Sequence, residues 1–160
     1  MTIISRLQPH RAFVQALAGL VCMAACAPAW AALGGSQASV DADVLALHGS
    51  VASAQRAAFT VKIITLPTGT AVNEFIATGG QVAAVSWRGP RPPNLSQLLG
   101  DYFADYQTAL AARQQGQHSR HLLLDSGRMR FESSGHMRDL HGSAWLPALM
   151  PQGVSAGDLQ

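Results

Sequence analysis

The chain has 160 residues, of which 48% are hydrophobic and 12% charged, and its formal net charge is +2. Arg6 and Arg11 account for that excess, because the chain beyond residue 31 carries nine basic and nine acidic residues. A neutral chain with Lys62 as its one lysine lacks the broad basic surface that phosphate backbones require, which argues against nucleic-acid binding.

Residues 1–31 have the layout of a secretory signal peptide. Two arginines precede an apolar run at residues 12–27, and residues 29–31 (AWA) form a small-x-small cleavage site. We expect cleavage after Ala31 and a single domain over residues 32–160. A retained membrane anchor is the alternative, but the run is shorter than the roughly 20 residues that a spanning helix needs, and Pro28 ends it. No stable transmembrane segment is therefore expected after signal cleavage.

Both cysteines, Cys22 and Cys26, lie inside this leader. Residues 23–26 (MAAC) resemble a bacterial lipoprotein cleavage box with Met23 where leucine is usual, so a membrane-tethered lipoprotein acylated at Cys26 remains an alternative. After cleavage at Ala31 the domain has no cysteine, and its core alone must hold it together.

The first part of the mature chain predicts little regular structure. Residues 32–35 (ALGG) indicate a flexible start. Ser36 is a plausible cap for a short amphipathic helix that presents Val40, Val44 and Leu47 before Gly49 ends it. Residues 50–57 (SVASAQRA) are small and polar and are interpreted as a linker.

Residues 59–87 predict a three-stranded antiparallel meander. Apolar and polar residues alternate over 59–64, Pro67 and Gly69 supply a turn, a second strand runs over 70–77, and Gly79 and Gly80 reverse the chain again. The third strand covers 82–87, with Ala83, Val85 and Trp87 expected on one face.

A stiff connector at residues 89–93 (GPRPP) leads to the longest predicted helix, capped by Asn94 and running from Leu95 to about Gln115. Its apolar side chains recur at helical spacing and suit it to covering one sheet face. They are Leu95, Leu98, Leu99, Tyr102, Phe103, Tyr106 and Leu110.

Beyond Gly116 the pattern returns to strands, at residues 121–125, 128–133 and 136–145, with turns at Ser126-Gly127 and Ser134-Gly135. The predicted fold is α+β: a small antiparallel sheet of two three-stranded meanders, with one long and one short amphipathic helix packed on it. Phe75 stands four residues before Gly79, and Phe131 four before Gly135, so an internal duplication is an alternative to chance similarity.

Few residues suggest a catalytic or metal-binding site. The histidines His48, His118, His121, His136 and His141 have no recognisable metal-ligand spacing and are interpreted as solvated. Asp101 and Asp105 lie one helical turn apart and are assigned to a wet helix face. No serine stands in a nucleophile elbow and no phosphate loop is present, so no catalytic, cofactor-binding or metal-binding residue is assigned.

Two other groups of side chains have competing interpretations. The aromatic residues Trp87, Tyr102, Phe103, Tyr106, Phe131 and Trp145 are assigned to the core rather than to a ligand platform. The rigid loop over residues 88–93 carries the guanidiniums of Arg88 and Arg91 and is either a contact site for a partner or a plain connector.

Several short motifs together resemble the exported bacterial proteins grouped as domain of unknown function 2844. They are residues 32–35 (ALGG), 66–70 (LPTGT), 74–75 (EF), 85–87 (VSW) with 89–90 (GP), 98–100 (LLG) with 102–103 (YF), 135–138 (GHMR), 144–147 (AWLP), Pro151 and 153–154 (GV). Phe75 stands where the family has tyrosine. The resemblance implies export and no established activity, so it transfers no site residue.

The expected function is therefore that of an exported envelope protein, periplasmic or secreted, which binds another envelope protein rather than catalysing a reaction. An edge strand such as residues 59–66 would accept a partner's strand. The competing hypothesis is a metal-dependent or other enzyme that uses His121, His136 and Asp139 in a cleft between the sheet and the long helix. The oligomeric state does not follow from the sequence.

Overall fold

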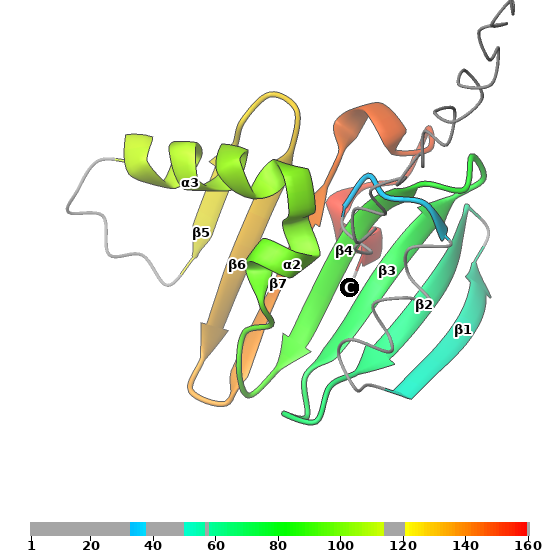
Figure 1. Cartoon of the computed structure of the whole chain (residues 1–160), viewed down its shortest axis with the longest axis horizontal. Coiled ribbons are helices and arrows are strands. Elements are labelled where there is room, and N and C mark those ends of the chain that lie inside the picture. Colours follow the sequence, from blue (N-terminus) through cyan, green and yellow to red (C-terminus); the bar gives the residue numbers. More distant parts are fainter. Residues whose placement is uncertain (1–32, 38–49, 57, 114–120, 160) are drawn as a thin grey trace, which may run out of the picture.

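The computed structural model describes residues 33–37, 50–56, 58–113 and 121–159, which form one seven-stranded antiparallel sheet (Figure 1). The strand order is β1-β2-β3-β4-β7-β6-β5. The strands are β1 (Ser50–Arg56), β2 (Phe59–Thr65), β3 (Ala71–Ala77), β4 (Val82–Gly89), β5 (Leu122–Asp125), β6 (Arg130–His136) and β7 (Asp139–Trp145).

The predicted meander over residues 59–87 is confirmed as β2, β3 and β4. Its first turn is closed by two backbone hydrogen bonds between Leu66 and the residues at Gly69 and Thr70. Gly69 has a φ of 82°, the positive value that the turn requires and that glycine adopts without steric cost. The local turn chemistry of this segment therefore determined its strand boundaries.

The third strand differs from the prediction in which side chains share a face. Opposite the Phe75–Ile76 step the register shifts, so that β4 contributes one extra residue. Val85 and Trp87 pack in one hydrophobic cluster, whereas Ala83 packs in another. The predicted shared face of Ala83, Val85 and Trp87 is wrong because the bulge reverses the alternation.

Residues 50–56 were predicted to be a linker, and that prediction is wrong. They form β1, which pairs with β2 over its whole length, from Ser50 opposite Thr65 to Arg56 opposite Phe59. The side chains of β1 are small and, except for Ala54, exposed. Because neither face of the strand is buried, its sequence lacks the apolar alternation by which strands are recognised.

The predicted flexible start is also wrong for the residues that the structure describes. Leu33 is only 2% exposed and lies in the main core cluster. The N–H of Gly34 donates to Val82 O, and the N–H of Val82 donates to Gly35 O. The predicted short helix after Ser36 and the signal peptide lie outside the described residues.

The predicted long helix is present but consists of two pieces, α2 (Leu95–Leu99) and α3 (Phe103–Ala112), joined by a 3-10 turn at Gly100–Tyr102. The Asn94 cap is confirmed, since its side-chain oxygen accepts from the N–H groups of Ser96 and Gln97. Gly100 has a φ of 50° and interrupts the α-helical geometry. In Figure 1 both pieces cross one face of the sheet, with α3 over β5.

The predicted turn at Ser134-Gly135 lies elsewhere in the structure. Ser134 and Gly135 lie inside β6, and the reversal occurs at Met137 and Arg138, where Arg138 has a φ of 70°. A Cβ on Gly135 would lie within 2.8 Å of the Cα atom of Leu140 in β7. This glycine therefore serves the close approach of two strands and not the turn itself.

The predicted single antiparallel sheet is present, but it has seven strands rather than the six of two three-stranded meanders. β4 pairs antiparallel with β7, and Val85 lies opposite Ala144. The predicted class of an antiparallel sheet with a helix packed on it holds. The third strands of the two predicted meanders are thus neighbours, as a local two-fold axis would place them, and the internal duplication stays a prediction.

Candidate functional site

The two faces of the central strands differ in chemistry. The face beneath α2 and α3 carries the larger cluster of buried apolar side chains, including Val85, Trp87 and Phe131. On the opposite face the strand partners form a cross-sheet row of polar residues, in which Asn73 lies opposite Ser86, Ser86 opposite Ser143, and Ser143 opposite Glu132. We call this second surface the open face, because α2 and α3 pack on the other one.

A pocket of about 520 Å³ lies along this polar row. Such a volume is within the range of sites that hold small molecules. The residues that line it come from β3, β4, β6, β7 and the residue before β5. They are Asn73, Ser86, Trp87, Arg88, His121, Glu132, Ser133, Ser134, His141, Gly142 and Ser143.

The row's two serines are buried and hydrogen-bonded. Ser86 and Ser143 are 5% and 2% exposed. Asn73 Nδ2 donates to Ser86 Oγ at 3.3 Å, and Ser143 Oγ donates to Glu132 Oε1, also at 3.3 Å. Because all four residues are on paired strands, the positions of these polar groups are set by the sheet rather than by loops.

At one end of the row, Arg88 and Asp139 form an ion pair with two hydrogen bonds. Arg88 Nε and Nη2 each donate to one carboxylate oxygen, at 2.9 Å. The hydrogen bonds from Arg88 hold the pKa of Asp139 below its ordinary value, and Asp139 raises the pKa of Arg88 in return. Both side chains remain largely exposed, so this pair lies at the surface and its strength depends on salt.

His141 is the pocket residue with an unsatisfied nitrogen. Its Nδ1 atom is buried and has no hydrogen-bond partner within the part of the chain that the structure describes. Buried polar atoms are nearly always hydrogen-bonded in folded proteins. A residue that lines the pocket thus contains an unpaired polar atom.

The three residues of the hypothetical catalytic cleft do not all line the pocket. His121 lines the pocket, whereas His136 lies opposite Asp139 at the β6–β7 hairpin and does not line it. Asp139 is already bound by Arg88. Over the described residues, no group of three or more His, Cys, Asp or Glu side chains is arranged to hold a metal ion.

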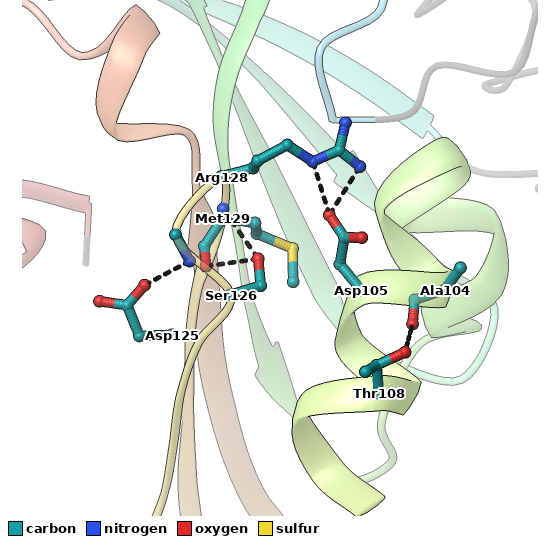
Figure 2. A network of polar contacts seen from close by, with 8 residues as sticks. Ala104, Asp105, Thr108, Asp125, Ser126, Arg128 and Met129 are labelled. Atoms are coloured by element: carbon teal, nitrogen blue, oxygen red, sulfur yellow. Dashed lines mark hydrogen bonds and ion pairs between the residues drawn. The ribbon is translucent and has the colours of Figure 1, made fainter. Parts of the chain in front are cut away.

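The carboxylate pair of the long helix has a structural role. Arg128, in the β5–β6 turn, donates from Nε and Nη2 to Asp105 Oδ2, at 3.0 and 2.7 Å, which Figure 2 shows. Its guanidinium also lies 5.2 Å from the centre of the Tyr102 ring. Asp101 is exposed, as expected of a wet helix face, whereas Asp105 is only partly exposed and is ion-paired. The ion pair connects α3 to the β5–β6 turn.

The connector at residues 89–93 is tied to the first turn of the meander. Thr70 is fully buried, and its hydroxyl donates to Arg91 O at 2.7 Å. A Cβ on Gly89 would collide with Thr70. Arg88, predicted to belong to an exposed contact loop, lies in β4 and is committed to Asp139.

The aromatic residues are confirmed as core. Trp87 and Phe131 are 4% and 1% exposed and their ring centres lie 5.5 Å apart. Tyr106 from α3 packs on Phe131 at 4.8 Å, and burial raises the pKa of its phenol. Tyr102, Phe103 and Trp145 are partly buried against the two core clusters.

Sequence reasoning missed Asn73, Ser86, Glu132 and Ser143, which form the polar row. The signal was present, because polar residues occupy alternate positions at Ser86 and Arg88, at Glu132 and Ser134, and at His141 and Ser143. Alternation of this kind marks a polar sheet face. Only the pairing of β4 with β7 brings the three strands together.

A family model described as "Protein of unknown function (DUF2844)" matches residues 29–159. The chain belongs to this family. No curated protein and no solved structure matches the chain. In the described ranges, no helix is both long and apolar enough to cross a membrane, and nothing in them indicates nucleic-acid binding.

Proposed function

We propose that this member of the DUF2844 family is an exported, non-catalytic binding module of the bacterial envelope, and that its ligand site is the open-face pocket. The observation that carries the proposal is the polar row on the floor of a 520 Å³ pocket, next to the unsatisfied Nδ1 of His141. Fixed hydrogen-bonding groups in a concave site are what small-ligand recognition requires.

The charges of the side chains that line the pocket determine which class of ligand it can bind. Glu132 contributes a negative charge, and Arg88, the arginine among the described lining residues, is neutralised by Asp139. An anion would therefore be repelled, whereas a hydroxyl or ammonium group would donate to Glu132. The ligand we propose is a small polar molecule that is neutral or cationic and donates hydrogen bonds.

Native mass spectrometry of the protein purified under non-denaturing conditions from its own host tests the site directly. We expect a small molecule to remain bound to the wild type and to be lost from Glu132→Gln, which keeps the shape of the side chain but removes its charge. Calorimetric titration with small neutral polyols, amines and carboxylates then tests the class, and we expect binding only among the first two.

Asp101→Asn is the matched control, because it makes the same chemical change on an exposed residue of the helical segment, away from the pocket. It should retain the ligand. Retention by Glu132→Gln as well, or binding of carboxylates in preference to amines, would contradict this assignment of the site.

Export is the second part of the proposal. It is supported by the signal-like residues 1–31 and by the burial of Leu33, since cleavage after Ala31 would leave this core residue in the mature protein. Mass spectrometry of the protein recovered from the envelope fraction should give a chain that begins at Ala32. An acylated N-terminal Cys26 would instead establish the membrane-tethered alternative.

A further inference from the structure

The two edges of the sheet are protected to different degrees. β5, at one edge, has only four residues, ends in Asp125 and lies against α3. A short strand, a terminal charge and a covering helix are the usual means by which proteins keep a sheet edge from pairing with another chain.

β1, at the other edge, lacks the short length and, within the described residues, the covering helix that protect β5. It is seven residues long, pairs with β2 without a bulge and contains no proline. Its one charged residue, Arg56, is at its end. β1 pairs with β2 on one side, and no other described strand pairs with it. The expected edge at residues 59–66 is thereby corrected, because β1 covers β2.

We propose that β1 pairs antiparallel with β1 of a second copy of this chain, joining two seven-stranded sheets into one. The sequence of β1 is compatible with a two-fold axis at Ser53. Each Ser53 then lies opposite the partner's Ser53, and Ala52 lies opposite the partner's Ala54. Val51 meets the partner's Gln55.

The charge and size of the β1 side chains favour a second copy of this chain as the pairing partner. Arg56 faces the partner's Ser50, so the two copies place no like charges opposite each other, which would destabilise an antiparallel pair. The other side chains of β1 are small or uncharged, and backbone hydrogen bonds would supply most of the attraction. A closed two-fold contact of this kind also stops at the dimer.

One strand pair buries less area than a standard stable interface, so dissociation is expected in the micromolar to millimolar range. Sedimentation equilibrium over that concentration range, on the mature chain, should show a monomer–dimer equilibrium. A single monomeric species up to about 1 mM would overturn the proposal.

The two-fold axis at Ser53 gives a specific test, because this exposed residue would lie opposite Ser53 of the second copy. Ser53→Lys should weaken dimerisation at least tenfold, since it brings two ammonium groups together, and Ser53→Glu should do the same with two carboxylates. An equimolar mixture of the two variants should recover dimers at or below the wild-type dissociation constant, because opposite charges then meet.

The mixture also separates the proposal from a folding defect, since a misfolded variant would not be rescued by another. Ser53 lies opposite Lys62 within its own chain, so each variant's free energy of unfolding is measured alongside. Dimers that persist in both variants, or a mixture that fails to associate, would overturn the Ser53 axis. Neither outcome bears on the pocket, which lies on β3, β4, β6 and β7.

Discussion

Neighbouring residues of the same strands have different roles on the helix-covered face and on the open face of the sheet. The rings of Trp87 and Phe131 pack against each other beneath α3, whereas Ser86 and Glu132, one position away in each strand, form part of the polar row. The first pair is nearly dry and apolar. The second retains polar groups whose hydrogen bonds are long, at 3.3 Å. The helical face should therefore hold more of the stability than the polar part of the open face that lines the pocket, although a second apolar cluster around Phe75 and Leu159 packs beside that pocket. Substitutions can test this division.

The largest effect is expected from Phe131→Ala. Phe131 is 1% exposed and contacts Trp87 and Tyr106, so its removal leaves a cavity between the sheet and α3. The free energy of unfolding should fall by about 3–5 kcal/mol. Chemical denaturation measures this loss. A loss comparable to that of an open-face serine variant would break the division between the two faces.

Gly142→Ala should have the second-largest effect on stability. Gly142 lies opposite Trp87, whose indole occupies the space that a Cβ would enter, and the backbone oxygen of Glu132 is also within 2.6 Å of that position. The strand or the indole must shift, at a cost of about 1–3 kcal/mol. Thermal unfolding should show the loss, together with altered tryptophan fluorescence. Gly79→Ala is the control, since a Cβ there meets no atom within 4 Å.

Ser143→Ala, on the open face, should cost less. It removes one hydrogen bond to Glu132, whose net contribution to stability is about 0.5–1.5 kcal/mol. Ligand retention in native mass spectrometry should nevertheless fall, because the pocket floor loses a hydroxyl. A variant that keeps its ligand while losing several kcal/mol of stability would reverse the roles assigned to the two faces.

The smallest effect concerns pH and the exposed Arg88–Asp139 pair. Because Arg88 lowers the pKa of Asp139 below its ordinary value of 3.8, this carboxylate stabilises the fold above the unfolded pKa. The stabilisation disappears as the pH falls through the lower, folded pKa. Between about pH 5 and pH 2, wild type should lose slightly more stability than Asp139→Asn. Identical pH profiles would show that the pair contributes nothing.

Local sequence signals predicted the parts of the fold that are determined locally. The turn at Pro67 and Gly69, the Asn94 cap and the apolar stripe of the long helix all follow from a few adjacent residues. The same reasoning failed where a residue's role depends on a distant strand. Gly135 was assigned to a turn, but it permits the approach of Leu140 in β7, and the bulge at Ala83 exists only in the pairing of β3 with β4.

The sequence by itself determined the meander of β2 to β4, the helix that packs on one face of the sheet and membership in the DUF2844 family. The tertiary structure decided that β1 is a strand, that β4 and β7 join the halves into one sheet, and that Ser86, Ser143 and Glu132 meet in a pocket. The physical reason is that turns, caps and periodicity arise between residues close in the chain. The pairing of β4 with β7 depends on backbone hydrogen bonds between residues more than fifty positions apart, which leave no local pattern.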